Sequence, residues 1–90
     1  MSTVRIPPVL RDSVNGQRQV DASGATVSDA LDDLFDRFPD LRLRVTEDGE
    51  LSRFINVYVN DRDVRYRDGL ATALGADDTI ILLPAMAGGA

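Results

Sequence analysis

One predicted amphipathic helix restricts the fold of this sequence more than any other feature, because the rest of the chain has to cover its apolar face. Between Thr26 and Phe38 the apolar residues recur at three- and four-residue spacing, which places them on a single helix face. Thr26 is positioned to cap the first turn, and Asp29 suits both a capping box and the positive end of the helix dipole. Pro39 is expected to end the helix near Phe38. The apolar face, which other segments must cover, consists of Val27, Ala30, Leu31, Leu34, Phe35 and Phe38.

A strand, a turn and a second strand are predicted before this helix. Residues 3–6 alternate as a first strand, and Pro7–Pro8 restricts that strand to an edge or a bulge. We expect the strand to resume at Val9–Leu10. Asn15–Gly16 predicts a hairpin turn, because both residues tolerate positive φ, and residues 17–21 return as the second strand.

The segment after the helix is ambiguous. Leu41–Val45 alternates between apolar and charged residues, which by its period predicts a strand. It also follows the helix closely, so a short helical extension stays open. Asp48–Gly49 is a further turn signal.

The strongest strand pattern is Phe54–Asn60, which is rich in β-branched and aromatic residues. We expect the face formed by Ile55, Val57 and Val59 to lie in the core. The opposite face then carries Phe54, Asn56 and Tyr58. Asn60–Asp61 predicts a turn.

Three short elements are predicted near the end of the chain. Residues 64–66 read as a short strand and residues 71–74 as a single helical turn. Residues 79–83 form a last strand that is apolar on both faces, which favours a central position in the sheet. Ile80 and Leu82 should pack on the helix, while Ile81 and Leu83 point the other way with Phe54 and Tyr58. The expected fold is α+β, with a mixed sheet wrapped over one main helix.

Composition excludes several functions. The chain has no Cys, His or Lys, and all ten basic residues are Arg, so side-chain thiolate, imidazole and amine catalysis are ruled out. We therefore do not expect an autonomous enzyme. The net charge of −5 argues against nucleic acid and suits a basic patch on a partner protein. No membrane span or signal peptide is predicted, and a chain without Cys suits a cytoplasmic location. The aspartates on the helix favour a solvated face over a metal site: Asp29, Asp32, Asp33 and Asp36.

The last six residues, 85–90, are expected to form a flexible tail after a domain of residues 1–84. Gly88–Gly89 follows the last strand, where a diglycine has no packing role. One reading is a frayed terminus. The other is that a backbone without Cβ atoms threads a narrow channel and brings a carboxylate to a reactive centre.

Two stretches resemble one protein family over nearly the whole chain. They are Arg53-Phe-Ile-Asn-Val-Tyr-Val-Asn-Asp61 with Asp63-Val-Arg-Tyr66, and the ending Leu83-Pro-Ala-Met-Ala-Gly-Gly89. Both resemble the ThiS/MoaD sulfur-carrier proteins, and within them the CysO-type carriers of cysteine biosynthesis. This resemblance implies the ubiquitin-like β-grasp fold.

The resemblance also implies a carrier rather than a catalyst. An E1-like activating enzyme would use ATP to adenylate the carboxylate of Gly89, next to Gly88, and a sulfur donor would convert it into a thiocarboxylate. The acceptor would be a pyridoxal-phosphate-dependent cysteine synthase or another sulfur-accepting enzyme. The chain itself would bind no cofactor. The residues expected to contact partners are Phe54, Tyr58, Ile81, Leu83, Pro84, Ala85, Met86 and Ala87.

Ala90 departs from the family pattern, which usually ends at the second glycine. The resemblance implies trimming of Ala90 by a JAMM-type metallopeptidase, and the alternative is that Ala90 disables the carrier. Three other functions stay open: the small subunit of molybdopterin synthase, a ubiquitin-like modifier that forms isopeptides with Lys, and a sulfur carrier for a natural-product pathway.

Overall fold

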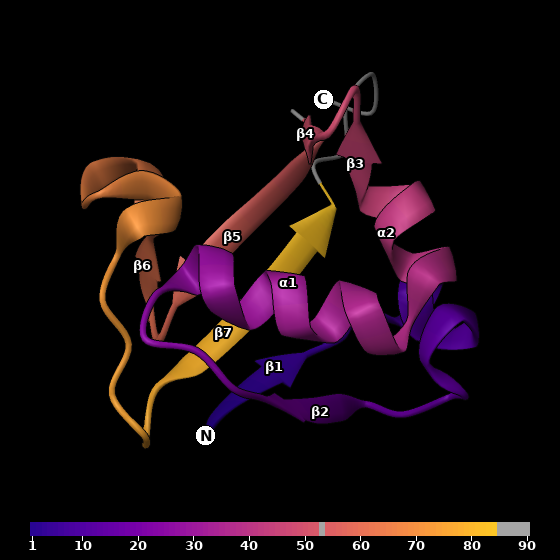
Figure 1. The fold of residues 1–90 in the computed structure, drawn as a ribbon, viewed down its shortest axis with the longest axis horizontal. Coiled ribbons are helices and arrows are strands. Elements are labelled where there is room, and N and C mark those ends of the chain that lie inside the picture. Colours follow the sequence, from indigo (N-terminus) through magenta and orange to yellow (C-terminus); the bar gives the residue numbers. More distant parts are fainter. Residues whose placement is uncertain (53, 85–90) are drawn as a thin grey trace.

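The computed structural model describes residues 1–52 and 54–84, and Figure 1 shows a mixed sheet with helices on one face. The five-stranded sheet has the order β2-β1-β7-β5-β6. Its strands are β1 (Ser2–Arg5), β2 (Gln19–Ala22), β5 (Ile55–Val59), β6 (Arg62–Asp63) and β7 (Thr79–Pro84). β1 and β7 run parallel, while the other neighbours are antiparallel. The central position predicted for the last strand is therefore confirmed.

The main helix, α1 (Val27–Arg37), crosses one face of this sheet. Its cap is as predicted, because the backbone N–H of Asp29 donates to the Thr26 hydroxyl at 3.2 Å. A second helix, α2 (Pro39–Val45), follows at once and leads into a hairpin of β3 (Thr46–Glu47) and β4 (Glu50–Leu51). The turn of this hairpin is the predicted Asp48–Gly49 pair, and both residues have positive φ.

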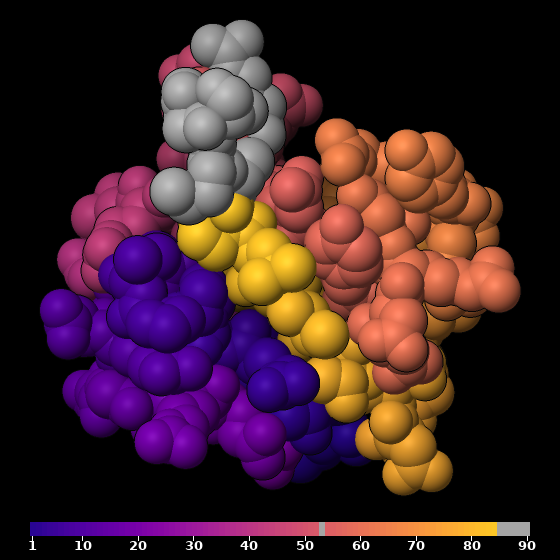
Figure 2. All heavy atoms as spheres, turned by 180° about the vertical axis from the view of Figure 1, so that it is seen from behind, coloured from indigo at the N-terminus to yellow at the C-terminus, as the bar shows by residue number. Residues whose placement is uncertain are grey.

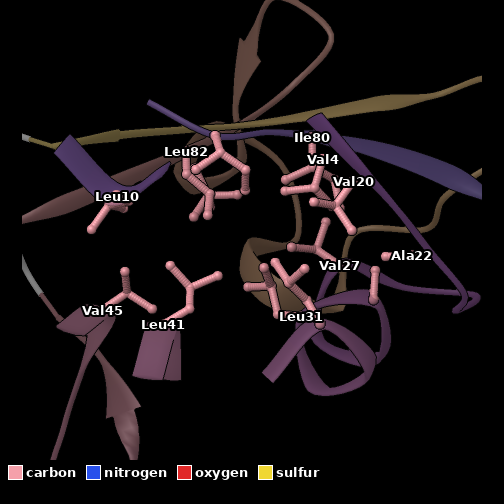
Figure 3. Close-up of a cluster of buried hydrophobic side chains, with 14 of the residues drawn as sticks. Val4, Leu10, Val20, Ala22, Val27, Leu31, Leu41, Val45, Ile80 and Leu82 are labelled. Carbon is pink, nitrogen blue, oxygen red and sulfur yellow. The ribbon is translucent and has the colours of Figure 1, made fainter. Parts of the chain in front are cut away.

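The core lies between α1, α2 and the sheet (Figure 3). Burial of these aliphatic side chains is the main favourable contribution to folding, at about 25 cal/mol per Å² of apolar surface removed from water. The buried apolar residues are Val4, Ile6, Leu10, Val14, Val20, Ala22, Val27, Ala30, Leu31, Leu34, Leu41, Val45, Val57, Val59, Val64, Ile80 and Leu82. Within the described ranges, no helix is both long and apolar enough to cross a membrane.

The strand predicted for Leu41–Val45 is wrong, and the helical extension is what forms. Pro39 occupies the first turn of α2, where its missing N–H costs nothing. Leu41 and Val45 are fully buried four residues apart, whereas Leu43 is 78% exposed. The alternating pattern therefore gave the wrong prediction, because it treated Leu43 as a core residue.

Two other segments that were predicted as strands form 3₁₀ helices instead. Val9–Leu10 belongs to the 3₁₀ helix η1 (Pro8–Val14), in which Pro8 starts the helix and Leu10 and Val14 are buried. Residues 64–66 form η2 (Val64–Tyr66), because the Asp63 carboxylate accepts a hydrogen bond from the Arg65 N–H at 2.9 Å and turns the chain.

The turns predicted near these segments are closer to the observed structure than the strands were. Asn15 and Gly16 both have positive φ, although η1 lengthens the connection between β1 and β2. The helical turn predicted at residues 71–74 lies slightly earlier, at η3 (Gly69–Ala71), where the Thr72 hydroxyl donates to the Gly69 carbonyl at 2.6 Å.

Candidate functional site

One row of side chains crosses the sheet on the face opposite α1. Arg5 of β1 is the register partner of Ile81 in β7, and Ile81 is the partner of Tyr58 in β5. Tyr58 in turn lies opposite Asp63 of β6. Because directly paired residues point to the same face, this row has an apolar centre with a charged residue at each end.

The strand β7 separates the core from this face. Ile80 and Leu82 are buried, at 0% and 1% exposure, while Leu83 is 43% exposed and Ile81 is half-buried. Figure 2 views the molecule from the side opposite α1, and β7 runs across that face between β1 and β5. The structure thus places Ile81 and Leu83 away from the helix, where the strand pattern put them.

Phe54 extends the apolar surface toward the end of β7. It is 42% exposed just before β5. We call Phe54, Tyr58, Ile81 and Leu83 the sheet patch. Pro84, also predicted as a partner contact, is paired with Ile55, so strand alternation puts it on the same side as Leu82 rather than with Ile81 and Leu83. The other predicted site residues lie outside the described residues: Ala85, Met86, Ala87, Gly88, Gly89 and Ala90.

A hollow of about 650 Å³ beside Ile81 and Leu83 is lined by three arginines. Arg5 and Arg18 are exposed, and the Nε of Arg11 donates to the Ile6 carbonyl at 3.1 Å. Sequence reasoning missed these cations as site residues. The alternation of β1 held the signal for one of them, because Arg5 must point away from the core if Val4 and Ile6 point into it.

An ion pair borders the other end of the row. The Nη2 of Arg65 lies 2.7 Å from the Asp63 Oδ2. Hydrogen bonds from the Arg65 side chain and backbone hold the pKa of Asp63 below its usual value, and the same carboxylate raises the pKa of Arg65. Arg65 therefore stays protonated beside Tyr58. Asp63 stays ionised, and the positive charge of Arg65 balances its negative charge.

Hydrogen bonds from the turn after β5 fix the start of β7. The Asp78 carboxylate accepts from the Gly75 N–H at 2.8 Å and from the Asn60 Nδ2 at 3.1 Å. Asn60, which has φ of 56°, also donates its N–H to the Thr79 carbonyl at 2.7 Å. The bonds to Asp78 lower its pKa, the one from the Gly75 backbone most. They hold β7 in register with β5.

The described residues contain no group of acidic, His or Cys side chains that could hold a metal ion. On α1, Asp33 instead accepts hydrogen bonds from the Ser23 N–H at 2.9 Å and from Arg37 at 3.1 Å.

Comparison with known proteins shows which family this chain belongs to. The ThiS family model matches residues 4–89. The sulfur carrier protein CysO of Mycobacterium tuberculosis is 44% identical over 90 residues, which is 97% of each chain. A chain in the crystal structure of the Amycolatopsis orientalis BexX/CysO complex is 45% identical, with a TM-score of 0.89 over 99% of this chain and 100% of that one. The small archaeal modifier protein 1 of Methanosarcina acetivorans has a TM-score of 0.88 at 32% identity, over 98% and 95% of the two chains.

These relatives cover nearly the whole chain, and their names include both sulfur carriers and a small archaeal modifier protein. The chain therefore has the ubiquitin-like β-grasp fold and belongs to the ThiS family.

Proposed function

We propose that this protein carries sulfur as a thiocarboxylate on the carboxyl group of Gly89 and delivers it in cysteine biosynthesis. The observation that carries the proposal is the sheet patch on β7, the strand that leads directly into residues 85–89. A partner that docks on Leu83 and Phe54 binds beside the end of β7, and residues 85–89 follow β7 in the sequence. The similarity to CysO over nearly the full length supports the choice of sulfur as cargo.

The chemistry runs in two steps on the partner enzymes. In the first, an E1-like activating enzyme joins the Gly89 carboxylate to AMP and releases pyrophosphate from ATP, which turns a poor acyl donor into a good one. In the second, a sulfur nucleophile forms the carbon–sulfur bond and AMP leaves. This chain supplies the carboxylate and the docking surface as a co-substrate and holds no cofactor of its own.

Ala90 is removed before activation in this scheme. The family model ends at Gly89, which leaves Ala90 outside the matched residues. A β-methyl at the reacting carboxylate would crowd an active site shaped for glycine. A JAMM-type metallopeptidase in the cytoplasm is the proposed trimming enzyme.

Docking on partners supports the carrier role. A similar chain was crystallised with a second protein, BexX. For this chain, the proposed partners are the activating enzyme, the peptidase and a pyridoxal-phosphate-dependent cysteine synthase or another sulfur acceptor.

The acceptor is tested by turnover. The thiocarboxylate form is mixed with a cysteine synthase from the same genome and O-phosphoserine, and cysteine is quantified against the carboxylate form. Cysteine produced only from the thiocarboxylate supports the proposal. The same low yield from both forms overturns the choice of acceptor.

A second function has one observation in its favour. The modifier protein of Methanosarcina acetivorans shares the fold at 32% identity, so attachment to Lys residues of other proteins is the alternative use of the same carboxylate. If this chain forms conjugates of higher mass when it is incubated with the activating enzyme and cell extract, its function is that of a protein modifier.

A further inference from the structure

A groove lies beside α1, on the side of the molecule that Figure 1 faces and away from the sheet patch. It has a volume of about 540 Å³ and runs between α1, the β3–β4 hairpin and η3. Its lining includes three apolar side chains that are only part-buried although they pack on the core: Phe35, Leu51 and Leu70. Apolar surface thus stays open to solvent here.

The apolar lining continues past this groove. A second hollow, of about 440 Å³, shares Glu50, Leu51 and Leu70 with the first. Its own lining includes the apolar residues Ile55, Val57 and Val64 and also the Asp63–Arg65 ion pair. Two neighbouring hollows joined by Leu51 and Leu70 offer separate places for two apolar side chains of one bound segment.

The charged residues around the first groove are mostly acidic. Asp32 and Asp36 of α1 and Glu50 of β4 are all exposed and line it, against one cation, Arg42. Among the residues that the structure describes, none of these three carboxylates is in an ion pair, in contrast to Asp33, which pairs with Arg37. The carboxylates therefore have no internal partner in the described part of the chain to give up when an external cation binds.

The two sides of the molecule differ in charge. The hollow next to the sheet patch is lined by Arg5, Arg11 and Arg18, whereas the groove beside α1 has the opposite sign. Partner surfaces are selected by complementary charge, so one partner surface does not suit both sides.

We propose that the groove beside α1 binds an amphipathic segment of a partner protein. The apolar side chains of the segment occupy the two hollows, and its Arg or Lys side chains lie along Asp32, Asp36 and Glu50. This goes beyond the carrier function, because the groove beside α1 shares no lining residue with the sheet patch. The segment contacts a different set of residues from an enzyme docked on the sheet patch, and it can tether the carrier to that enzyme or to another one.

The test is an NMR titration of the ¹⁵N-labelled full chain with a synthetic helical peptide that places a row of Leu on one face and Arg along both sides of that row. A twin peptide with Glu in place of Arg is the control. We expect the Arg peptide to shift the amides of Phe35, Leu51 and Leu70, and the Glu peptide to leave them unchanged. The variant Glu50→Arg should weaken binding about fivefold, the upper range for one exposed ion pair.

Two matched variants make the result specific. Asp77→Arg makes the same charge change in an exposed loop away from the groove, and it should leave the affinity within about twofold. Phe54→Ala lies in the sheet patch and should also have no effect, so failure of the carrier function and failure of this proposal are told apart.

Three outcomes overturn the proposal. The first is no localised shift at about 1 mM peptide, the weakest binding worth assigning to a site. The second is equal weakening by Glu50→Arg and Asp77→Arg, which would mean attraction to net charge alone. The third is that the groove amides shift with protein concentration before peptide is added, because the occupant would then be a second copy of this chain.

Discussion

Tyr58 lies directly opposite Ile81 in the antiparallel ladder between β5 and β7, and both side chains are half-buried on the face of the sheet opposite α1. Their neighbours along the strands, Val57, Val59, Ile80 and Leu82, are buried against the helices. The alternation of two adjacent strands therefore produces the core and the sheet patch together. A substitution in one of these sets should affect stability, and a substitution in the other should affect docking.

Phe54→Ala should weaken docking on the activating enzyme by about 1–3 kcal/mol, the range for an aromatic anchor at an interface. Phe54 is 42% exposed in the free protein, so the midpoint of thermal unfolding should change little. Affinity is measured by calorimetry and unfolding by circular dichroism.

The control is Leu43→Ala, which removes an apolar side chain that is 78% exposed on α2, outside the sheet patch. It should leave the affinity unchanged. If Phe54→Ala lowers stability but not affinity, Phe54 is a core residue and its place in the docking surface is wrong.

Leu82→Ala should mainly lower stability and Ile81→Ala should mainly weaken docking, although the residues are adjacent. Leu82 is 1% exposed, so its truncation should lower the free energy of unfolding by about 2–5 kcal/mol. Ile81→Ala should cost less stability and should weaken docking more. Urea unfolding and the binding assay are run on both variants, and equal losses of stability would show that Ile81 is packed as deeply as Leu82.

Deletion of Ala90 should speed activation. The activating enzyme and ATP are incubated with the chain ending at Ala90 or at Gly89, and pyrophosphate release is followed. We expect the chain ending at Gly89 to react faster, because no β-methyl lies at the reacting carboxylate. Equal rates in the absence of a peptidase would contradict the need for trimming.

Asp78→Asn should reduce the loss of stability in acid. The hydrogen bonds from Gly75 and Asn60 lower the pKa of Asp78 in the folded protein from its ordinary value of 3.8. The folded state therefore binds this proton less readily than the unfolded state. The stabilisation is fully present above the ordinary value and is lost as the pH falls through the lowered one. Asp63, whose pKa is lowered mainly by Arg65, adds in the same direction.

Thermal unfolding from about pH 6 down to about pH 2 measures this effect. The wild-type melting temperature should fall steeply at the acid end, and the curve for Asp78→Asn should be flatter there. Parallel curves would mean that the hydrogen bonds to Asp78 do not favour its charged form.

The sequence was sufficient for the main helix, for the central position of β7 and for the two faces of β7, because those segments have long, consistent apolar patterns. It failed at Leu41–Val45, where three apolar residues fit a strand by alternation and two of them fit a helix by their four-residue spacing. Which of the two forms depends on whether Leu43 is buried, and that is decided by packing against η1 and α1 rather than by the local sequence.

The sequence likewise predicted the apolar residues of the candidate site but not all of its arginines. The apolar residues Phe54, Tyr58, Ile81 and Leu83 follow from strand alternation. Arg11 and Arg18 do not, because they reach the hollow from η1 and from the residue before β2, whose positions depend on the tertiary fold. The groove beside α1 was also out of reach, since Leu51 and Leu70 meet α1 only after folding.

The most direct test of the carrier function is the intact mass of the protein after reaction with the activating enzyme, ATP and a sulfide donor, using the chain that ends at Gly89. We predict the mass increase for replacement of one carboxylate oxygen by sulfur, on the last residue, and loss of this increase when ATP is omitted. A mass that stays at the carboxylate value, with isopeptide-linked conjugates to Lys residues of other proteins in its place, would contradict sulfur carriage and identify a modifier.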